Sequence, residues 1–296
     1  MLEEDGGVQT DEAIRAAALA AAQVGVPAAD PAVVRVGENG VVLLPNAGVL
    51  ARVVRGPEAI HHVRRELEVA AWLASQEVPA TRPVRPAPVV VGPYVVSFWG
   101  YLPDGRAADL VTLAESLRLL HGVPRPVGLL PRLSPFARFG EQLDRGAALG
   151  AGDRAFLRER RDRLAAQWEQ TTFALGETVL HGDAHMENLL VTVDGRRAFV
   201  DLETVCVGPP EWDLTLSALY YECGWFTEHE YATFAETYGY DVRLGSAWPV
   251  LRQIRMLRMT LWLAQSAGTD AQRRRQLTHR LSTLRDGSAP AGWTGF

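Results

Sequence analysis

The strongest constraint on the fold is a hairpin that interrupts the otherwise helical second part of this 296-residue chain. The runs NLLVTV and RRAFVDL flank Asp194-Gly195, a pair typical of a type I′ turn between antiparallel strands. Because side chains alternate along a strand, Asn188 at the start of one arm and Asp201 near the end of the other are expected at the same open end. Asp183 precedes the hairpin in a loop.

Two oxygen-bearing side chains at the mouth of one hairpin suit a hard cation. Mg²⁺ prefers carboxylate and amide oxygens and keeps waters or substrate phosphates at its other positions. We therefore predict that Asn188 and Asp201 hold this metal, which leaves Asp183 to accept a proton or a hydrogen bond from a substrate hydroxyl. Taken singly, each aspartate would more often be a loop cap or a surface charge, but the joint pattern is far more specific.

The first part of the chain has the pattern of a small antiparallel sheet. A helix is expected at residues 10–24, and the β-rich runs VVRVG, VVLLP and VLARVVR follow, divided by the turn signals ENG and NAG. The segment 57–77 has the apolar spacing of an amphipathic helix. The segment 86–102 then predicts two more strands around Gly92-Pro93. These elements give a five-stranded sheet with one helix against it.

The second part of the chain is mainly helical. Thr227 and Glu230 form a capping box before one of the expected helices. Helical periodicity covers Leu110–His121, Asp153–Thr171, Leu214–Trp225, Tyr231–Tyr238, Pro249–Gln265 and Ala271–Arg285. We therefore predict an α+β protein with two lobes, one at residues 1–102 that includes the leading helix and one at residues 103–296.

Composition excludes several classes of protein. No apolar run approaches the ~20 residues of a membrane span, and the Ala-rich start lacks the features of a signal peptide, so a cytoplasmic protein is expected. A net charge of −5 argues against nucleic acid as a partner. All 30 residues counted as Lys or Arg are arginine. Cys206 and Cys223 have no zinc-site spacing and are expected to be buried free thiols.

The motif His181-Gly182-Asp183, with Asn188 five residues after the aspartate and Asp201 on the next strand, resembles the aminoglycoside phosphotransferase and choline kinase family. That family is a small-molecule branch of the protein-kinase-like fold, and the resemblance extends over nearly the whole chain. It implies a bilobal fold in which Asp183 is catalytic and Asn188 and Asp201 bind Mg²⁺, as in the protein-kinase pattern. Asp213 and His181 would support the catalytic loop.

The same resemblance assigns nucleotide-binding residues in the first lobe. Arg52 falls where the family places a phosphate-contacting Lys or Arg, and Glu66 matches its ion-pair partner. The alternative for this pair is a surface salt bridge of little consequence. FWGYL resembles the adenine-binding hinge, which implies roles for Trp99, Gly100 and Tyr101, although the two aromatic side chains fit a core equally well. The turn at residues 37–40 either approaches nucleotide phosphates or is a plain hairpin turn.

The implied function is a Mg²⁺-dependent kinase that transfers the γ-phosphoryl group of ATP or GTP to a hydroxyl of a small molecule. The partners would be this acceptor and the nucleotide, with no membrane involved, and the chain would be a monomer or a weak homodimer. Family members act on aminoglycosides, macrolides, peptide antibiotics, choline, homoserine and amino sugars. One alternative is a kinase of a macrolide or of a primary metabolite such as choline, homoserine or an amino sugar. The alternative from another class is a catalytically silent nucleotide-binding protein on the same scaffold.

An acidic, aromatic-rich stretch suggests the kind of acceptor. Residues 198–242 contain nine carboxylates and no Arg or Lys. Carboxylates attract protonated amines, and aromatic faces hold ammonium groups, so an amine-bearing antibiotic such as an aminoglycoside or a basic peptide is the favoured acceptor. The candidate contacts are Glu203, Glu222, Glu228 and Glu230. Alternatively, these acids lie on solvated helix faces and pair with Arg252, Arg255 and Arg258, while the aromatic residues form core.

Overall fold

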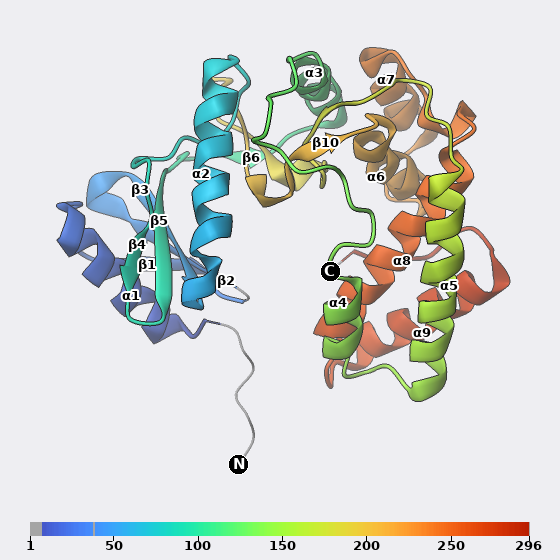
Figure 1. Cartoon of the computed structure of the whole chain (residues 1–296), viewed down its shortest axis with the longest axis horizontal. Helices are drawn as coiled ribbons and strands as arrows, with labels where there is room; N and C mark the ends of the chain where they lie inside the picture. Colours follow the sequence, from blue (N-terminus) through green and yellow to red (C-terminus); the bar gives the residue numbers. More distant parts are fainter. Residues whose placement is uncertain (1–7, 38, 296) are drawn as a thin grey trace. The chain divides into compact units, whose positions relative to one another are not determined.

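The computed structural model describes residues 8–37 and 39–295 (Figure 1). The chain divides into two compact units. Unit 1 takes in the chain up to Ala108 together with Pro126–Leu130 and Glu187–Val205, and unit 2 takes in the rest. The hairpin that follows the H-G-D motif therefore belongs to unit 1, whereas the motif itself belongs to unit 2.

Unit 1 contains the expected five-stranded sheet, all of whose strand pairs are antiparallel. The spatial order is β1-β2-β3-β5-β4, so β3 and β5 lie inside the sheet. The strands are β1 (Ala32–Arg35), β2 (Asn39–Leu44), β3 (Val49–Arg55), β4 (Val89–Val91) and β5 (Tyr94–Gly100). Register places Arg52 opposite Ser97 on β5. The predicted strands and their antiparallel pairing are confirmed.

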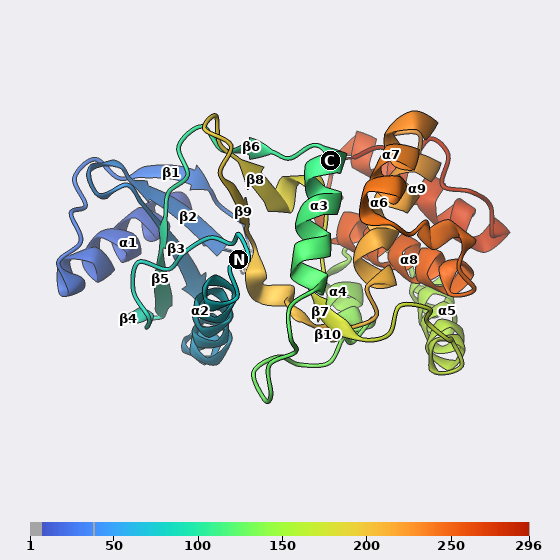
Figure 2. The ribbon, with the colours of Figure 1, turned by 90° about the horizontal axis from the view of Figure 1, so that it is seen from above.

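Both helices predicted for this part of the chain are present, and both pack against the sheet, whereas the sequence analysis placed only one of them there. Five alanines of α1 (Thr10–Val24) are buried together with Val42, Ala51 and Val53 of the sheet. The small residues Gly40 and Ala13 let α1 lie close to the sheet. A Cβ added at Gly40 would be only 2.7 Å from the Cβ of Ala13. Since neighbouring residues of a strand point to opposite faces, Arg52 points away from α1, and its guanidinium contacts Glu66 of α2 (Ile60–Ser75). The helices α1 and α2 lie on different sides of the sheet (Figure 2).

The predicted hairpin is present in unit 1, but its turn differs from the prediction. Strands β8 (Leu189–Val191) and β9 (Arg197–Phe199) pair antiparallel, and β6 (Arg106–Ala107) joins at the β8 edge. A type I′ turn needs positive φ at both central residues, yet Gly195 has φ +80° and Asp194 does not lie in that region. The amide of Thr192 donates to the Arg196 carbonyl, and that of Gly195 to the Thr192 carbonyl. The connection is therefore a three-residue loop with a glycine bulge.

Unit 2 is mainly helical, as expected. Helix α4 (Phe139–Arg145) and the short strands β7 (Thr178–Leu180) and β10 (Cys206–Gly208), which pair antiparallel, were not predicted. The six predicted helices are α3 (Leu110–His121), α5 (Ala151–Glu169), α6 (Glu211–Glu222), α7 (Glu228–Tyr238), α8 (Trp248–Ser266) and α9 (Ala271–Asp286). The predicted α+β class is confirmed.

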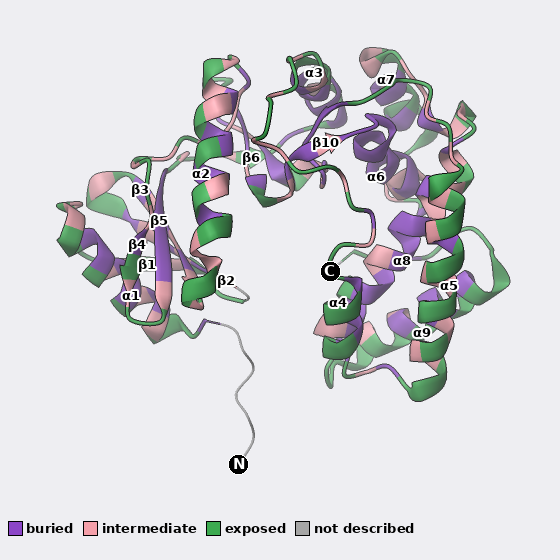
Figure 3. Ribbon diagram, in the orientation of Figure 1, coloured by how far each residue is buried: buried purple, intermediate pink, exposed green. Residues whose placement is uncertain are grey.

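Burial in unit 2 concentrates on α6 and α8 (Figure 3). All residues of α6 from Glu211 to Leu219 are buried, including two carboxylates. The Thr227 and Glu230 capping box is present at the start of α7, and both cysteines are buried free thiols. In the described part of the chain, no helix combines the length and the apolar character needed to cross a membrane. Unit 2 therefore has a helical core that contains charged groups, and these need partners.

Candidate active site

The H-G-D motif lies in the loop that follows β7 in unit 2. Leu180 of β7 pairs with Cys206 of β10, which fixes the chain immediately before His181. His181 is fully buried, whereas the side chain of Asp183 is 39% exposed. The loop therefore has an anchored base and a carboxylate that is accessible to solvent.

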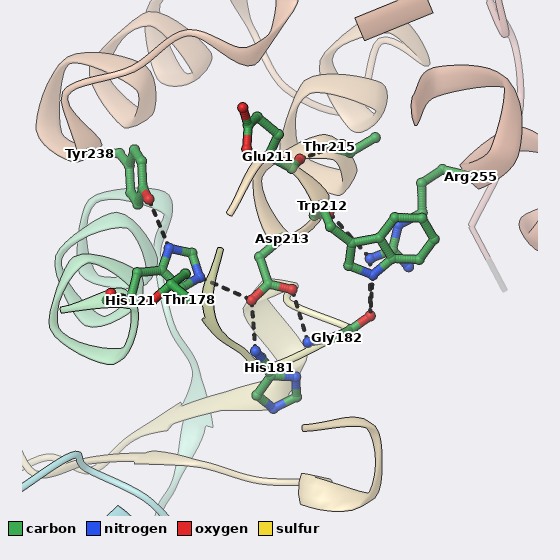
Figure 4. A network of polar contacts seen from close by, with 10 residues as sticks. All are labelled: His121, Thr178, His181, Gly182, Glu211, Trp212, Asp213, Thr215, Tyr238 and Arg255. Atoms are coloured by element: carbon green, nitrogen blue, oxygen red, sulfur yellow. Dashed lines mark hydrogen bonds and ion pairs between the residues drawn. The ribbon is translucent and has the colours of Figure 1, made fainter. Parts of the chain in front are cut away.

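Asp213 on α6 holds the backbone of this loop (Figure 4). Its carboxylate accepts hydrogen bonds from the amides of His181, at 2.7 Å, and Gly182, at 2.9 Å. The third partner is Nε2 of His121, at 3.1 Å. Burial opposes ionisation of this fully buried group, but the hydrogen bond and charge of His121 outweigh it and lower the pKa of Asp213. The structure thus places the Asp213 carboxylate against the backbone of the H-G-D loop.

A buried arginine of α8 also contacts the loop. Nη1 of Arg255 lies 3.3 Å from Oδ1 of Asp183, and Nη2 donates to the Gly182 carbonyl at 3.1 Å. The guanidinium lies 4.1 Å from the centre of the Trp212 ring, and Nε1 of Trp212 donates to the same Gly182 carbonyl. Sequence reasoning considered Arg255 only as a partner of surface acids and missed this contact.

In unit 1, Arg52 is shared by several carboxylates. Its Nη1 lies 2.6 Å from Glu66, its Nη2 lies 2.5 Å from Glu203, and Oδ1 of Asp201 lies 3.8 Å from that same nitrogen. Glu66 is only 6% exposed, so the alternative of a surface salt bridge does not describe this pair. We call Arg52, Glu66, Asp201 and Glu203 the arginine cluster.

The pKa values of the arginine cluster reflect burial and crowding of like charge. Burial, with the nearby charges of Glu203 and Asp201, raises the pKa of Glu66 to about 7, against the opposing charge of Arg52. Burial disfavours the charge on Arg52, but the three acids outweigh it and raise the Arg52 pKa. The guanidinium of Arg52 therefore stays protonated, and its single positive charge lies among three carboxyl groups.

Asn188 and Asp201 lie at one end of the β8–β9 hairpin. Asn188 ends the 3-10 turn Met186–Asn188, and its carbonyl accepts from the Val200 amide at 3.0 Å. Asp201 has a left-handed backbone, with φ 59° and ψ 56°, and starts the 3-10 turn Leu202–Thr204. This conformation is uncommon for a residue other than glycine and turns the chain sharply, so that Glu203 comes to Arg52.

The donor chemistry at this end of the hairpin fits Mg²⁺. An amide oxygen and a carboxylate are hard ligands, and Mg²⁺ commonly takes few protein ligands and completes its octahedron with water and phosphate oxygens. Within residues 8–37 and 39–295, no group of three or more His, Cys, Asp or Glu side chains forms a metal cluster. A metal held by Asn188 and Asp201 would complete its coordination with water or phosphate oxygens.

The segment resembling the hinge ends β5. Trp99 is 6% exposed and its Nε1 donates to Oγ of Ser97, so this side chain belongs to the core. The Gly100 amide donates to the Arg82 carbonyl, and the Tyr101 amide to the Gly48 carbonyl. The side chain of Tyr101 is exposed. Of the turn at residues 37–40, Glu38 lies outside the described residues.

The four acids expected near the acceptor lie in different surroundings. Glu203 belongs to the arginine cluster of unit 1. Glu222 pairs with Arg252, and Glu230 caps α7 by accepting from the amide and hydroxyl of Thr227. Glu228 is exposed in the first turn of α7. Among the aromatic residues of this stretch, Trp212, Tyr231 and Phe234 are buried, as the core alternative expected.

The family model described as Phosphotransferase enzyme family matches residues 22–254. The chain belongs to this phosphotransferase family. Because the match spans most of the chain, it includes both the arginine cluster and the loop of Asp183. The protein is therefore an enzyme of the phosphotransferase class, and the predicted family relationship is confirmed.

Solved structures of related fold are kinases of small molecules. An amicoumacin kinase in complex with AMP-PNP and Ca²⁺ has a TM-score of 0.68 at 14% identity, covering 89% of this chain and 90% of that one. A choline/ethanolamine kinase family protein from Mesorhizobium loti has a TM-score of 0.59 at 20% identity, with 94% of each chain covered. A Streptomyces rimosus aminoglycoside phosphotransferase in complex with ADP and streptomycin has a TM-score of 0.55 at 20% identity, covering 74% and 90%. No curated protein matches significantly.

Proposed function

We propose that this phosphotransferase moves the γ-phosphoryl group of ATP or GTP to a hydroxyl of a small molecule, with Mg²⁺ as cofactor. The observation that carries the proposal is the accessible carboxylate of Asp183 on a loop anchored by Asp213 and Arg255. Asn188 and Asp201 follow it in the order found in kinases. The nucleotides bound to the relatives, AMP-PNP and ADP, support a nucleotide as the phosphoryl donor.

In the proposed reaction, the acceptor oxygen bonds to the γ-phosphorus while the bond from that phosphorus to the β–γ bridging oxygen breaks. The nucleoside diphosphate leaves, and the hydroxyl proton goes to Asp183. Asn188 and Asp201 would hold Mg²⁺, whose charge neutralises phosphate oxygens. The transition state is loose, so alignment and charge carry most of the catalysis and no covalent enzyme intermediate is needed.

The remaining nucleotide contacts are proposed for unit 1. Arg52 would neutralise phosphate charge, with Glu66 fixing its position. Trp99, Gly100 and Tyr101 would border the adenine or guanine base, with Trp99 acting from the core. In functional terms we propose a nucleotide-binding lobe at residues 1–102 and a catalytic, acceptor-binding lobe at residues 103–296. The compact units differ from this division, because unit 1 extends to Ala108 and also takes in Pro126–Leu130 and Glu187–Val205.

The proposed acceptor is an amine-bearing alcohol, such as an aminoglycoside or a basic peptide antibiotic. Support comes from the related kinases, whose names include choline, ethanolamine, aminopropanol and aminoglycoside, all of them alcohols that carry an amine or a quaternary ammonium group. Of the four candidate acids, Glu228 is the one in unit 2 engaged in neither the Arg252 pair nor the α7 cap. We expect acceptor KM to rise with ionic strength, because salt screens attraction between exposed charges. A KM indifferent to salt would contradict the cationic acceptor.

A nucleotide-consumption screen tests the function directly. The purified protein, with Mg²⁺ and either ATP or GTP, is incubated with aminoglycosides, macrolides, cyclic peptides and primary metabolites. Products are then examined by mass spectrometry. A product heavier by one phosphoryl group identifies both the reaction and the acceptor. Binding of nucleotide without transfer to any member of a broad panel would favour a catalytically silent protein.

A further inference from the structure

Arg255 is a buried charge that reaches the loop of Asp183 from a distant part of the sequence. It lies on α8, 72 residues after Asp183, and its side chain is only 2% exposed. One guanidinium nitrogen faces Oδ1 of Asp183 at 3.3 Å, and the other donates to the Gly182 carbonyl at 3.1 Å. A single planar group therefore contacts both the backbone and the functional side chain of the loop.

The surroundings of Arg255 fix the guanidinium in place. It lies 4.1 Å from the centre of the Trp212 ring, and Nη2 is 3.4 Å from the Trp212 carbonyl. Trp212 itself donates to the Gly182 carbonyl at 2.8 Å, and the next residue, Asp213, accepts from the amides of His181 and Gly182. The loop is thus held on its amide side by Asp213 and on its carbonyl side by Trp212 and Arg255.

We propose that Arg255 is a positioning residue for Asp183, setting the orientation of its carboxylate for transfer to the acceptor hydroxyl. This inference rests on the proposed function. A carboxylate that is 39% exposed on a loop can rotate about its side-chain bonds, and the geometry of phosphoryl transfer tolerates little misplacement. With Oδ1 held toward Arg255, the hydroxyl proton would go to Oδ2, which lies 3.8 Å from Nε2 of His185.

Arg280 supplies a matched control in the same unit. It is also 2% exposed, lies over a tryptophan ring with its guanidinium 4.8 Å from the centre of Trp293, and donates to the carbonyls of Met259 and Thr294. Burial lowers the pKa of Arg280 to about 10. The two arginines therefore share burial, ring stacking and two backbone contacts, whereas only Arg255 contacts Asp183.

The experiment compares Arg255→Met, Arg255→Lys and Arg280→Met with the wild-type chain. With ATP, Mg²⁺ and the acceptor found in the screen, we expect Arg255→Met to lower kcat by about 10- to 100-fold, with KM for ATP within about twofold. Arg255→Lys keeps the positive charge but not the planar guanidinium, so its kcat should fall less than that of Arg255→Met. Arg280→Met should retain wild-type kcat per folded molecule, even if its Tm falls as far as that of Arg255→Met.

A second measurement does not depend on activity. Hydrogen exchange at residues 181–185 should speed up by about tenfold in Arg255→Met and stay near the wild-type rate in Arg280→Met. Equal kcat or equal loop exchange in the two methionine variants would overturn the positioning role. If Arg255→Met does not fold, the same comparison is made with Arg255→Lys. If the wild-type chain phosphorylates no acceptor, the proposed function is refuted. Hydrogen exchange at residues 181–185 then tests only whether Arg255 holds this loop in place.

Discussion

Removing Arg52 should destabilise unit 1 far more than removing an ordinary surface arginine. Arg52 lies 2.6 Å from Glu66 and 2.5 Å from Glu203, and Glu66 is nearly buried. Removing one partner of a buried ion pair leaves an uncompensated charge and typically costs about 3–5 kcal/mol. Because Glu203 is part exposed and Glu66, with a pKa of about 7, can take up a proton, we expect about 3 kcal/mol for Arg52→Met, the lower end of that range.

The double variant Arg52→Met/Glu66→Gln separates the stability lost through packing from the stability lost through an unpaired charge. Glu66→Gln keeps a hydrogen-bond acceptor for Arg52 and should cost about 1 kcal/mol. In Arg52→Met/Glu66→Gln the buried carboxylate is gone together with its partner, so the cost should be about 2 kcal/mol and not the additive value of about 4. The difference of about 2 kcal/mol measures the coupling between the two side chains.

Native-state hydrogen exchange of the α2 and β3 amides is the suitable assay, because it reports on unit 1 alone, whereas global unfolding of a chain with two compact units need not be two-state. Arg55→Met is the matched control, since Arg55 ends the same strand and pairs with Glu12 at the surface. A surface pair contributes at most about 1 kcal/mol. If Arg52→Met costs no more than Arg55→Met, or if the two changes in the arginine cluster are additive, the reasoning from shared charge is wrong.

Three further predictions concern residues of the candidate active site. Asp183→Ala should lower transfer by about 10²- to 10⁴-fold while calorimetry shows nearly unchanged nucleotide binding; transfer at near the wild-type rate would remove Asp183 from its role. Asp201→Asn should weaken nucleotide binding in Mg²⁺ more than in its absence, because it removes a charge from the proposed metal site, and equal Mg²⁺ dependence in both proteins would place the metal elsewhere. The folded-state pKa of Asp213 is lowered, so its stabilising effect is present above the usual aspartate pKa and is lost as pH falls through the folded value. Asp213→Asn should therefore be less stable at neutral pH and lose less stability on acidification, and parallel acid unfolding curves would refute this.

The sequence predicted elements well where local chemistry sets their ends. Helix α1 matches its predicted bounds, and Gly25 after it adopts the left-handed conformation that favours glycine. The strands of unit 1 alternate and are separated by turn residues, so their pairing could be predicted too. Helix α4 was missed because seven residues are too few for a periodic signal. Strands β7 and β10 have only three residues each.

For the candidate site too, residues in one short sequence motif could be predicted, whereas a residue brought in by tertiary packing could not. Asp183, Asn188 and Asp201 could be found because a fixed spacing within about twenty residues carries them. Arg255 could not, since its contact with Asp183 depends on how α8 packs against α6 and leaves no pattern in the sequence. Glu203 was grouped with the acceptor acids on charge alone. The left-handed backbone of Asp201 turns the chain there and brings Glu203 to Arg52, which a count of carboxylates cannot reveal.

The arginine cluster also explains why Arg52 is more than a substitute for lysine. Two different nitrogens of one planar guanidinium contact Glu66 and Glu203, and a third carboxylate, Asp201, lies within 3.8 Å. An ammonium is a compact point charge on a flexible stem and does not present this fixed fork. Arg52→Lys would keep the positive charge but give up the geometry that holds two acids at once. Since Glu203 follows Asp201 by two residues, the arginine ties the helix that carries Glu66 to the segment proposed to hold the metal.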